Sequence, residues 1–301
     1  MDLQTFFTSR AGTGTLMWLS RNLPLWLGLP IADLVIGLLA RRRDSGLVRA
    51  VRTNQSVVRG LPVDDRALDA IVRRVLRNAG RGYFEFYHRA SKGLSAVEDI
   101  ASFSPQIESM LQATLAGTAG ALVIALHISN FDLAAVAFAA RNIPLQILSY
   151  GTPPGGYQLQ NQLRIKAGLS ITPITGPSLR AAITRLRQGG TAVVGLDRPL
   201  PGVPRDEWLD FFGHPAPLSS GFVRLALATD ATMYLTWVEP TGDGTFSITS
   251  KPPLEVIRTG NRQEETQINS RRLLDLAEDV IRTHADEWMM FHPVWPQLLL
   301  A

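Results

Sequence analysis

Short apolar runs alternate with helix-like segments from Gly120 onward, and this alternation limits the fold more than any other feature of the sequence. The pattern begins with the apolar run ALVIALH at 121–127, which is followed by a helical segment at 130–141. Strands that alternate with helices are typical of an α/β fold with a largely parallel sheet. The same alternation continues, with strands predicted at 145–150, 191–197 and 231–239 and helices at 178–188, 219–228 and 262–288.

Two segments modify this pattern. A stretch rich in Gly, Pro and Gln at 151–162 indicates a loop, and FSITSK at 246–251 indicates an antiparallel strand after the turn TGDG. We therefore expect an α/β fold with a mixed, mostly parallel sheet flanked by helices. The chain is 46% hydrophobic, which is enough to bury a core of this kind.

The first part of the chain has a different character. Residues 46–115 have mostly helical spacing, so we expect a helical N-terminal region at 1–115 and an α/β domain at 116–301. The segment at about 11–43 is largely apolar, carries Trp18 and Trp26, and ends in three consecutive arginines.

This N-terminal segment favours contact with a membrane surface. Its longest uncharged stretch has eleven residues, 22–32, whereas a spanning helix needs roughly 20. Apolar side chains and tryptophans beside an arginine cluster are typical of a segment that lies in the membrane interface. A buried helical hairpin and a single tilted span remain alternatives.

One histidine stands at a position where chemistry is expected. His127 closes the first apolar run, and the carboxyl ends of strands are where α/β sheets bind ligands. Asp132 falls in the first turn of the next helix, from which its carboxylate can reach the imidazole. Such a pair is suited to general base catalysis, because the carboxylate fixes the tautomer of the ring. A structural histidine beside a helix-capping aspartate is the alternative.

Several other kinds of site are excluded. The absence of cysteine rules out disulfides, thiolate metal sites and a cysteine nucleophile. The chain has no Gly-x-Ser-x-Gly nucleophile turn, no dinucleotide-binding glycine motif, no Walker loop and no cluster with zinc-ligand spacing, so no metal is expected. If His127 is a base, the nucleophile is therefore a hydroxyl of the substrate.

The order of the motifs resembles that of a known superfamily. The spacing His-x-x-x-x-Asp after a strand is similar to the first motif of the glycerolipid and lysophospholipid acyltransferases. Three later blocks resemble the bacterial lipid A late (lauroyl/myristoyl) acyltransferases: LRQGGTAVVGLD at 186–197, the Phe-Phe-Gly block that begins at 210, and HADEWMMFHPVWP at 284–296. The resemblance covers nearly the whole chain.

The resemblance implies transfer of an acyl chain from acyl carrier protein or CoA to a hydroxyl of a membrane lipid. His127 is then the general base and Asp132 orients it. Asp197 occupies the downstream acidic position of the superfamily, and Arg198 follows it. No cofactor is implied beyond the thioester co-substrate, and the expected location is the cytoplasmic face of the bacterial inner membrane.

Two basic residues, Arg164 and Lys166, lie where a phosphate of the acceptor or of the pantetheine arm could be held. A solvated helix face is the alternative for both.

The sequence also departs from the resembled family. Asn130-Phe131-Asp132 stands where Asn-Trp-Glu is common, and LDRPLPG at 196–202 replaces the glycerolipid segment Pro-Glu-Gly-Thr-Arg. The acceptor therefore stays open among a lipid A-like lipid, a mannosylated inositol lipid and a lysophospholipid. A non-catalytic lipid or acyl-carrier binding protein and a fatty-acyl ester hydrolase are the alternative functions. Nucleic-acid binding is not expected, because the excess of positive charge lies in the apolar N-terminal segment.

Overall fold

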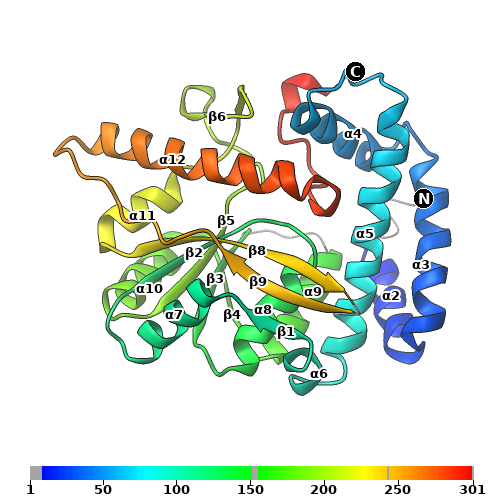
Figure 1. The fold of residues 1–301 in the computed structure, drawn as a ribbon, viewed down its shortest axis with the longest axis horizontal. Coiled ribbons are helices and arrows are strands. Elements are labelled where there is room, and N and C mark those ends of the chain that lie inside the picture. Colours follow the sequence, from blue (N-terminus) through cyan, green and yellow to red (C-terminus); the bar gives the residue numbers. More distant parts are fainter. Residues whose placement is uncertain (1–8, 151–154, 243, 300–301) are drawn as a thin grey trace.

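A mixed seven-stranded sheet forms the centre of the molecule (Figure 1). The computed structural model describes residues 9–150, 155–242 and 244–299. Within them the strand order is β1–β9–β8–β2–β5–β3–β4, and all neighbours are parallel except β8 and β9. This confirms the predicted α/β fold with a mostly parallel sheet. The strands are β1 (Ala101–Phe103), β2 (Ala121–Ala125), β3 (Leu145–Ser149), β4 (Ser170–Pro173), β5 (Thr191–Gly195), β8 (Thr232–Gly242) and β9 (Thr245–Ser250).

Helices cover both faces of this sheet, and a small hairpin lies outside it (Figure 1). The hairpin consists of β6 (Leu209–Phe211) and β7 (His214–Ala216). The helices are α2 (Arg10–Asn22), α3 (Leu25–Ala40), α4 (Gly46–Arg59), α5 (Ala67–Ala90), α6 (Ser95–Glu98), α7 (Pro105–Leu115), α8 (Phe131–Ala140), α9 (Gly155–Lys166), α10 (Gly176–Arg187), α11 (Gly221–Thr229) and α12 (Arg262–Thr283). Short 3₁₀ turns are η1 (Arg205–Glu207), η2 (Ala285–Glu287) and η3 (Pro296–Leu298).

Strand β2 shows why the central strands read as continuous apolar runs. Successive side chains of a strand point to opposite faces of the sheet. Leu122 and Ile124 therefore enter the core under α10, α11 and α12, whereas Ala121 and Val123 enter the core under α5, α7 and α8. Both faces are buried, so every position of the strand favours an apolar residue.

The structure differs from the sequence-based expectation in a few elements. Helix α9 begins at Gly155, inside the segment predicted to be a loop, whose residues 151–154 lie outside the described part. Strand β4 was not predicted. Strand β1 was not predicted either, and it joins the sheet through β9 although it precedes residue 116. The division into regions at 115/116 stays a prediction.

The N-terminal helices α2 and α3 form a hairpin that packs along α5 (Figure 1). Gly28 allows α3 to approach closely, because a Cβ at this position would lie 1.9 Å from the ring of Phe84 on α5. The Nδ1 atom of the buried His88 is 2.7 Å from the carbonyl oxygen of Ser20. This hydrogen bond ties the end of α2 to α5.

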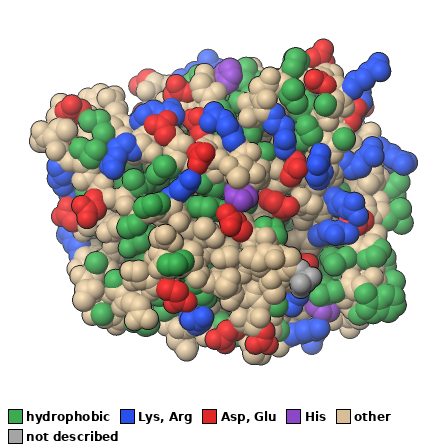
Figure 2. Space-filling view, viewed as in Figure 1, with side chains coloured by type: hydrophobic (Ala, Val, Ile, Leu, Met, Phe, Trp, Pro, Cys, Tyr) green, Lys and Arg blue, Asp and Glu red, His purple; other side chains and the backbone are tan. Residues whose placement is uncertain are grey.

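Large apolar side chains of this hairpin face solvent. Trp26 is 77% exposed and Trp18 is 65% exposed, and Leu27, Ile31, Leu34 and Leu38 are exposed with them. Figure 2 shows hydrophobic side chains gathered at the lower right, over α2 and α3. Among the described residues no helix has the length and apolar character needed to cross a membrane. Contact with a membrane interface stays a prediction, and this exposed apolar face agrees with it.

Candidate active site

The carboxyl ends of β2 and β5 bring a histidine and a carboxylate together. The two strands are parallel neighbours, and their last residues, Ala125 and Gly195, are paired. His127 and Asp197 each lie two residues beyond this pair, so both side chains leave the sheet edge at the same level. The Nδ1 atom of His127 is 2.6 Å from the Oδ1 atom of Asp197. This is the edge at which α/β sheets bind ligands.

The carboxylate of Asp197 is fully buried and accepts three hydrogen bonds. The imidazole of His127 contacts Oδ1, while Oδ2 accepts the backbone N–H of His127 at 3.0 Å and the indole N–H of Trp288 at 2.7 Å. Burial alone would raise the pKa of Asp197, but the charge of His127 and these hydrogen bonds outweigh burial and lower it. Asp197 is therefore ionised at neutral pH.

The second ring nitrogen of His127, Nε2, has no hydrogen bond to another described residue. The side chain is 23% exposed. Gly195 leaves room beside the ring, because a Cβ there would lie 3.1 Å from Cε1 of the imidazole. Phe131 packs edge-on against the ring, with 4.8 Å between the ring centroids. The imidazole is thus held at Nδ1 and is partly exposed, and its Nε2 has no partner among the described residues.

The structure does not join Asp132 to His127. The buried carboxylate of Asp132 accepts hydrogen bonds from Nε of Arg164, at 2.9 Å, and from Nη2 of the same guanidinium. Arg164 is itself buried on α9, and a buried guanidinium requires a compensating charge. The carboxylate that contacts the imidazole is therefore Asp197, whereas Asp132, the residue expected to orient His127, contacts Arg164. The catalytic role of Asp132 stays a prediction.

The predicted phosphate-binding residues have different surroundings. Arg164 is neutralised by Asp132; burial alone would lower the pKa of the guanidinium, but the charge of Asp132 raises it. Arg198 is half-buried, forms no ion pair with a described carboxylate, and its guanidinium lies 5.5 Å from the ring centre of Tyr150. Lys166 is exposed at the end of α9. Of these cations, Arg198 and Lys166 are the ones accessible to an anion.

Aromatic rings connect the two cations nearest the site. The ring of Tyr157 on α9 is contacted by the guanidinium of Arg164 at 5.1 Å and by that of Arg198 at 5.6 Å. Contacts of this kind are favourable, because the ring face carries partial negative charge. The Asp132–Arg164 pair therefore helps to hold the ring of Tyr157 in place, and Arg198 packs against the same ring.

Two features of the site were not predicted from the sequence. One is the hydrogen bond between His127 and Asp197, and the other is the indole of Trp288. A signal for the first is present, because ALH at 125–127 and GLD at 195–197 end two apolar runs in the same way. Trp288 falls in the block HADEWMMFHPVWP, but no local pattern indicates its hydrogen bond to Asp197, which is 91 residues away in the sequence.

Among all described residues, no group of three or more His, Asp or Glu side chains is placed to hold a metal ion.

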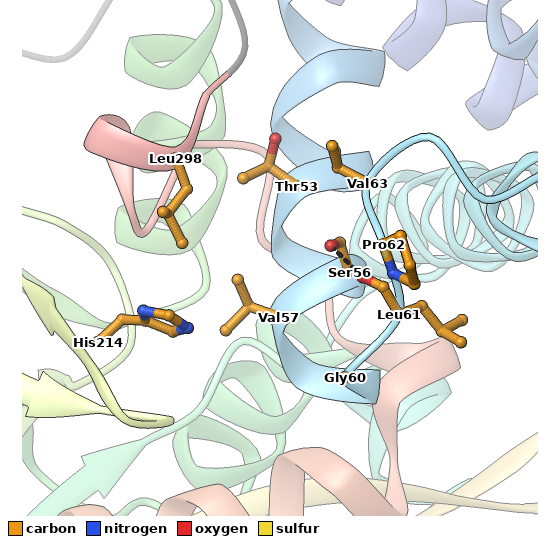
Figure 3. A pocket seen from close by; sticks show the side chains of 9 residues that line it. All are labelled: Thr53, Ser56, Val57, Gly60, Leu61, Pro62, Val63, His214 and Leu298. Atoms are coloured by element: carbon orange, nitrogen blue, oxygen red, sulfur yellow. Dashed lines mark hydrogen bonds between the residues drawn. The ribbon is translucent and has the colours of Figure 1, made fainter.

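A cavity of about 310 Å³ lies beside the C-terminal half of α4 (Figure 3). None of the residues that contact His127 or Asp197 lines it. Its lining residues are Thr53, Ser56, Val57, Gly60, Leu61, Pro62, Val63, His214 and Leu298.

Comparison with known proteins connects this fold to one family. The family described as bacterial lipid A biosynthesis acyltransferase matches residues 10–297. No curated protein matches the sequence. Among solved structures, the 1-acyl-sn-glycerophosphate (LPA) acyltransferase PlsC from Thermotoga maritima is similar at 13% sequence identity, with a TM-score of 0.36. That match covers 84% of this chain and 97% of the PlsC chain.

Proposed function

Because the chain belongs to the bacterial lipid A biosynthesis acyltransferase family, it is an acyltransferase that acts on lipids, and we propose that it acylates a hydroxyl group. The proposed donor is a fatty acyl thioester of acyl carrier protein or CoA. The proposed acceptor is a lipid or glycolipid of the membrane, with a lipid A-like lipid, a mannosylated inositol lipid and a lysophospholipid as the candidates.

One observation carries the proposed mechanism. His127 has Nδ1 held by an ionised, buried carboxylate, while its Nε2 has no hydrogen-bond partner among the described residues. In this state Nδ1 carries a proton and donates it in a hydrogen bond to Asp197. Nε2 therefore has the lone pair that a general base needs. The carboxylate then stabilises the imidazolium that forms when Nε2 takes a proton.

The proposed reaction proceeds without a covalent acyl-enzyme. Nε2 of His127 removes the proton of the acceptor hydroxyl while the oxygen attacks the carbonyl carbon of the thioester. The tetrahedral intermediate collapses, the C–S bond breaks, and the leaving thiolate takes the proton from Nε2. The products are the acylated lipid and the free thiol of the carrier, and His127 returns to its starting state. Asp197 changes neither charge nor position.

The accessible cations support an anionic substrate group. Arg198 directly follows Asp197 in the sequence and forms no ion pair with a described carboxylate. We propose that it holds a phosphate of the acceptor or of the pantetheine arm, with exposed Lys166 as a second contact. Arg164 has a supporting role in this proposal, because its charge is already neutralised by Asp132.

Exposed apolar side chains of α2 and α3 support a location at the membrane surface. A lipid acceptor does not leave the bilayer easily, so a transferase gains access to it by lying on the membrane. We propose that the hairpin rests in the interface with Trp18 and Trp26 among the headgroups. The proposed location is the cytoplasmic face of the inner membrane, where acyl carrier protein and CoA thioesters are available.

Mass spectrometry of total lipid extracts tests the function. Cells with the wild-type protein are compared with cells that lack it and with cells that carry His127→Ala. We expect one lipid class to gain a single acyl chain only with the wild-type protein, and the mass of that lipid identifies the acceptor. His214→Ala, in a second half-buried histidine that lines the separate cavity, is the matched control and retains transfer.

The same experiment distinguishes the alternatives. Normal transfer by a folded His127→Ala protein contradicts the mechanism. A rise in free fatty acid without an acylated product indicates a hydrolase, which uses water in place of the alcohol. Unchanged lipid and fatty acid pools indicate a binding protein.

A further inference from the structure

We infer that Trp288 is a positioning residue whose indole N–H fixes the carboxylate of Asp197 so that its other oxygen faces His127. The inference rests on the proposed function, because it assigns Trp288 a role through the proposed general base. The indole Nε1 is 2.7 Å from Oδ2 of Asp197, and both residues are fully buried. Trp288 touches neither Nε2 of His127 nor the space beside it in any contact that the structure shows, so its effect on catalysis is indirect.

The division of hydrogen bonds between the two oxygens of Asp197 supports this role. Oδ2 accepts two N–H groups, from the indole of Trp288 and from the backbone of His127, and Oδ1 is left for the imidazole. Rotation of the carboxylate would break all three hydrogen bonds in a buried site, where unpaired polar groups are costly. The indole therefore restricts the carboxylate to the orientation that holds Nδ1.

The backbone around Trp288 forms a second, independent connection to the base. Ile128 and Trp288 form an antiparallel bridge beside the sheet. The N–H of Met289 donates to the carbonyl of His127 at 2.7 Å, and the N–H of Ser129 donates to the carbonyl of Glu287 at 2.9 Å. The segment 287–289 thus runs along 127–129 and delivers the indole to Asp197. A buried tryptophan that only filled space would not need its backbone to be paired with residues 127–129.

The indole also influences the charge that the imidazole senses. A hydrogen bond to Oδ2 disperses part of the negative charge of Asp197, and it is one of the interactions that lower the pKa of this carboxyl. Without it, more of the charge is available to stabilise the imidazolium of His127. Loss of the indole N–H is therefore expected to change the charge distribution of the Asp197 carboxylate as well as to loosen its orientation.

Two phenylalanine substitutions test the inference in the full-length protein. Trp288→Phe removes the N–H that Asp197 accepts. Trp295→Phe is a matched control, because Trp295 is equally buried and its indole N–H donates to the carbonyl of Phe211 at 3.1 Å, away from Asp197. Both changes remove a bicyclic ring from the same core, so each variant is assayed at a temperature at which it is folded.

The readouts separate positioning from packing. With palmitoyl-CoA as donor and the acceptor found by lipid mass spectrometry, we expect Trp288→Phe to lower kcat about 10-fold with KM within about 2-fold, as for other groups that orient a catalytic residue. Trp295→Phe is expected to retain kcat.

The outcomes distinguish this inference from the proposed function. Equal kcat values for the two variants, or a loss in Trp288→Phe that falls on KM and not on kcat, overturn the role of Trp288 and leave the general base in place. Turnover by folded His127→Ala overturns both. If Trp288→Phe does not fold, site-specific replacement of Trp288 by 3-benzothienylalanine keeps the ring volume and removes only the N–H, and the same two readouts decide.

Discussion

Two buried carboxylates lie near His127: Asp132 is close to it in the sequence, and Asp197 contacts it in space. The two carboxylates have different partners. Asp197 follows the central strand β5 and contacts the imidazole of His127, whereas Asp132 lies in the first turn of α8 and contacts the guanidinium of Arg164. A guanidinium keeps its charge at all ordinary pH values, while an imidazole gains and loses a proton near neutrality. Asp197 is therefore suited to accompany a proton transfer, and Asp132 compensates a fixed charge.

The largest expected difference between these carboxylates is in turnover. The hydrogen bonds from Trp288 and from the His127 backbone will orient the amide of Asp197→Asn with its oxygen toward both donors. The NH₂ group then faces Nδ1, so His127 adopts the tautomer with the proton on Nε2 and cannot act as a base. We expect kcat to fall about 10³–10⁴-fold with little change in fold, measured by acyl transfer and circular dichroism.

Asp132→Asn is the control that tests this comparison between Asp197 and Asp132. Both substitutions replace a buried aspartate by its amide, but only Asp197 contacts the proposed base. If folded Asp132→Asn loses as much turnover as Asp197→Asn, Asp132 acts in catalysis as the motif spacing indicated, and the assignment of roles from the hydrogen bonds is wrong.

The next effect is on stability, and it has the opposite order. Asp132→Asn leaves the buried guanidinium of Arg164 without its counter-charge, which typically costs about 3–5 kcal/mol of unfolding free energy. Asp197→Asn costs less, because its amide oxygen keeps two donors and no fixed charge is left without a partner. Urea denaturation of the two variants measures the difference.

A double variant provides the control for this second prediction. Arg164→Met removes the unpaired charge and fits the space of the aliphatic stem, so we expect it to restore most of the stability that Asp132→Asn loses. Additive losses in the double variant would show that the two side chains do not form an energetically coupled pair.

The sequence predicted the histidine, the sheet and most elements, but not the pairing of the site residues. His127 stood out because it closes an apolar run, which is a local feature. The partner of its imidazole depends on β2 and β5 being neighbours in register, Ala125 opposite Gly195, and strand order is not encoded by local spacing. Asp132 was the nearer carboxylate in sequence, and proximity in sequence favoured it over Asp197.

Helix α9 shows a similar limit for the fold. Its glycines and glutamines have weak helical periodicity, so the segment was predicted as a loop. The ion pair of Arg164 with Asp132 and the contacts of Tyr157 hold it against the site, and these are tertiary interactions. Trp288 was missed for the same reason, since its hydrogen bond joins two distant segments.

The smallest expected effect on the free energy of unfolding comes from a third carboxylate, that of Asp33. It has two arginine partners and lies nearer the solvent than Asp132 or Asp197. Asp33 on α3 accepts hydrogen bonds from Arg81, at 2.6 and 2.8 Å, and from Arg77, at 2.6 Å. Burial alone would raise the pKa of Asp33, but the two arginines outweigh it and lower the pKa to about 2. Because both guanidinium groups are largely exposed, solvent screening reduces the contribution of the Asp33–Arg81 ion pair to about 1 kcal/mol.

The pH dependence of Asp33→Asn tests this value against the buried pair. A carboxyl whose pKa is lowered by folding stabilises the protein above its unfolded-state pKa, and that contribution is lost as the pH falls toward the folded-state pKa of about 2. The difference in unfolding free energy between wild type and Asp33→Asn should therefore be constant from pH 7 to about 5 and shrink toward pH 3. Asp230→Asn, which removes a carboxylate that is 78% exposed and paired with Arg258, is the control and should give a smaller difference throughout. A cost for Asp33→Asn as large as that for Asp132→Asn would mean that burial does not separate the two kinds of aspartate–arginine pair in this fold.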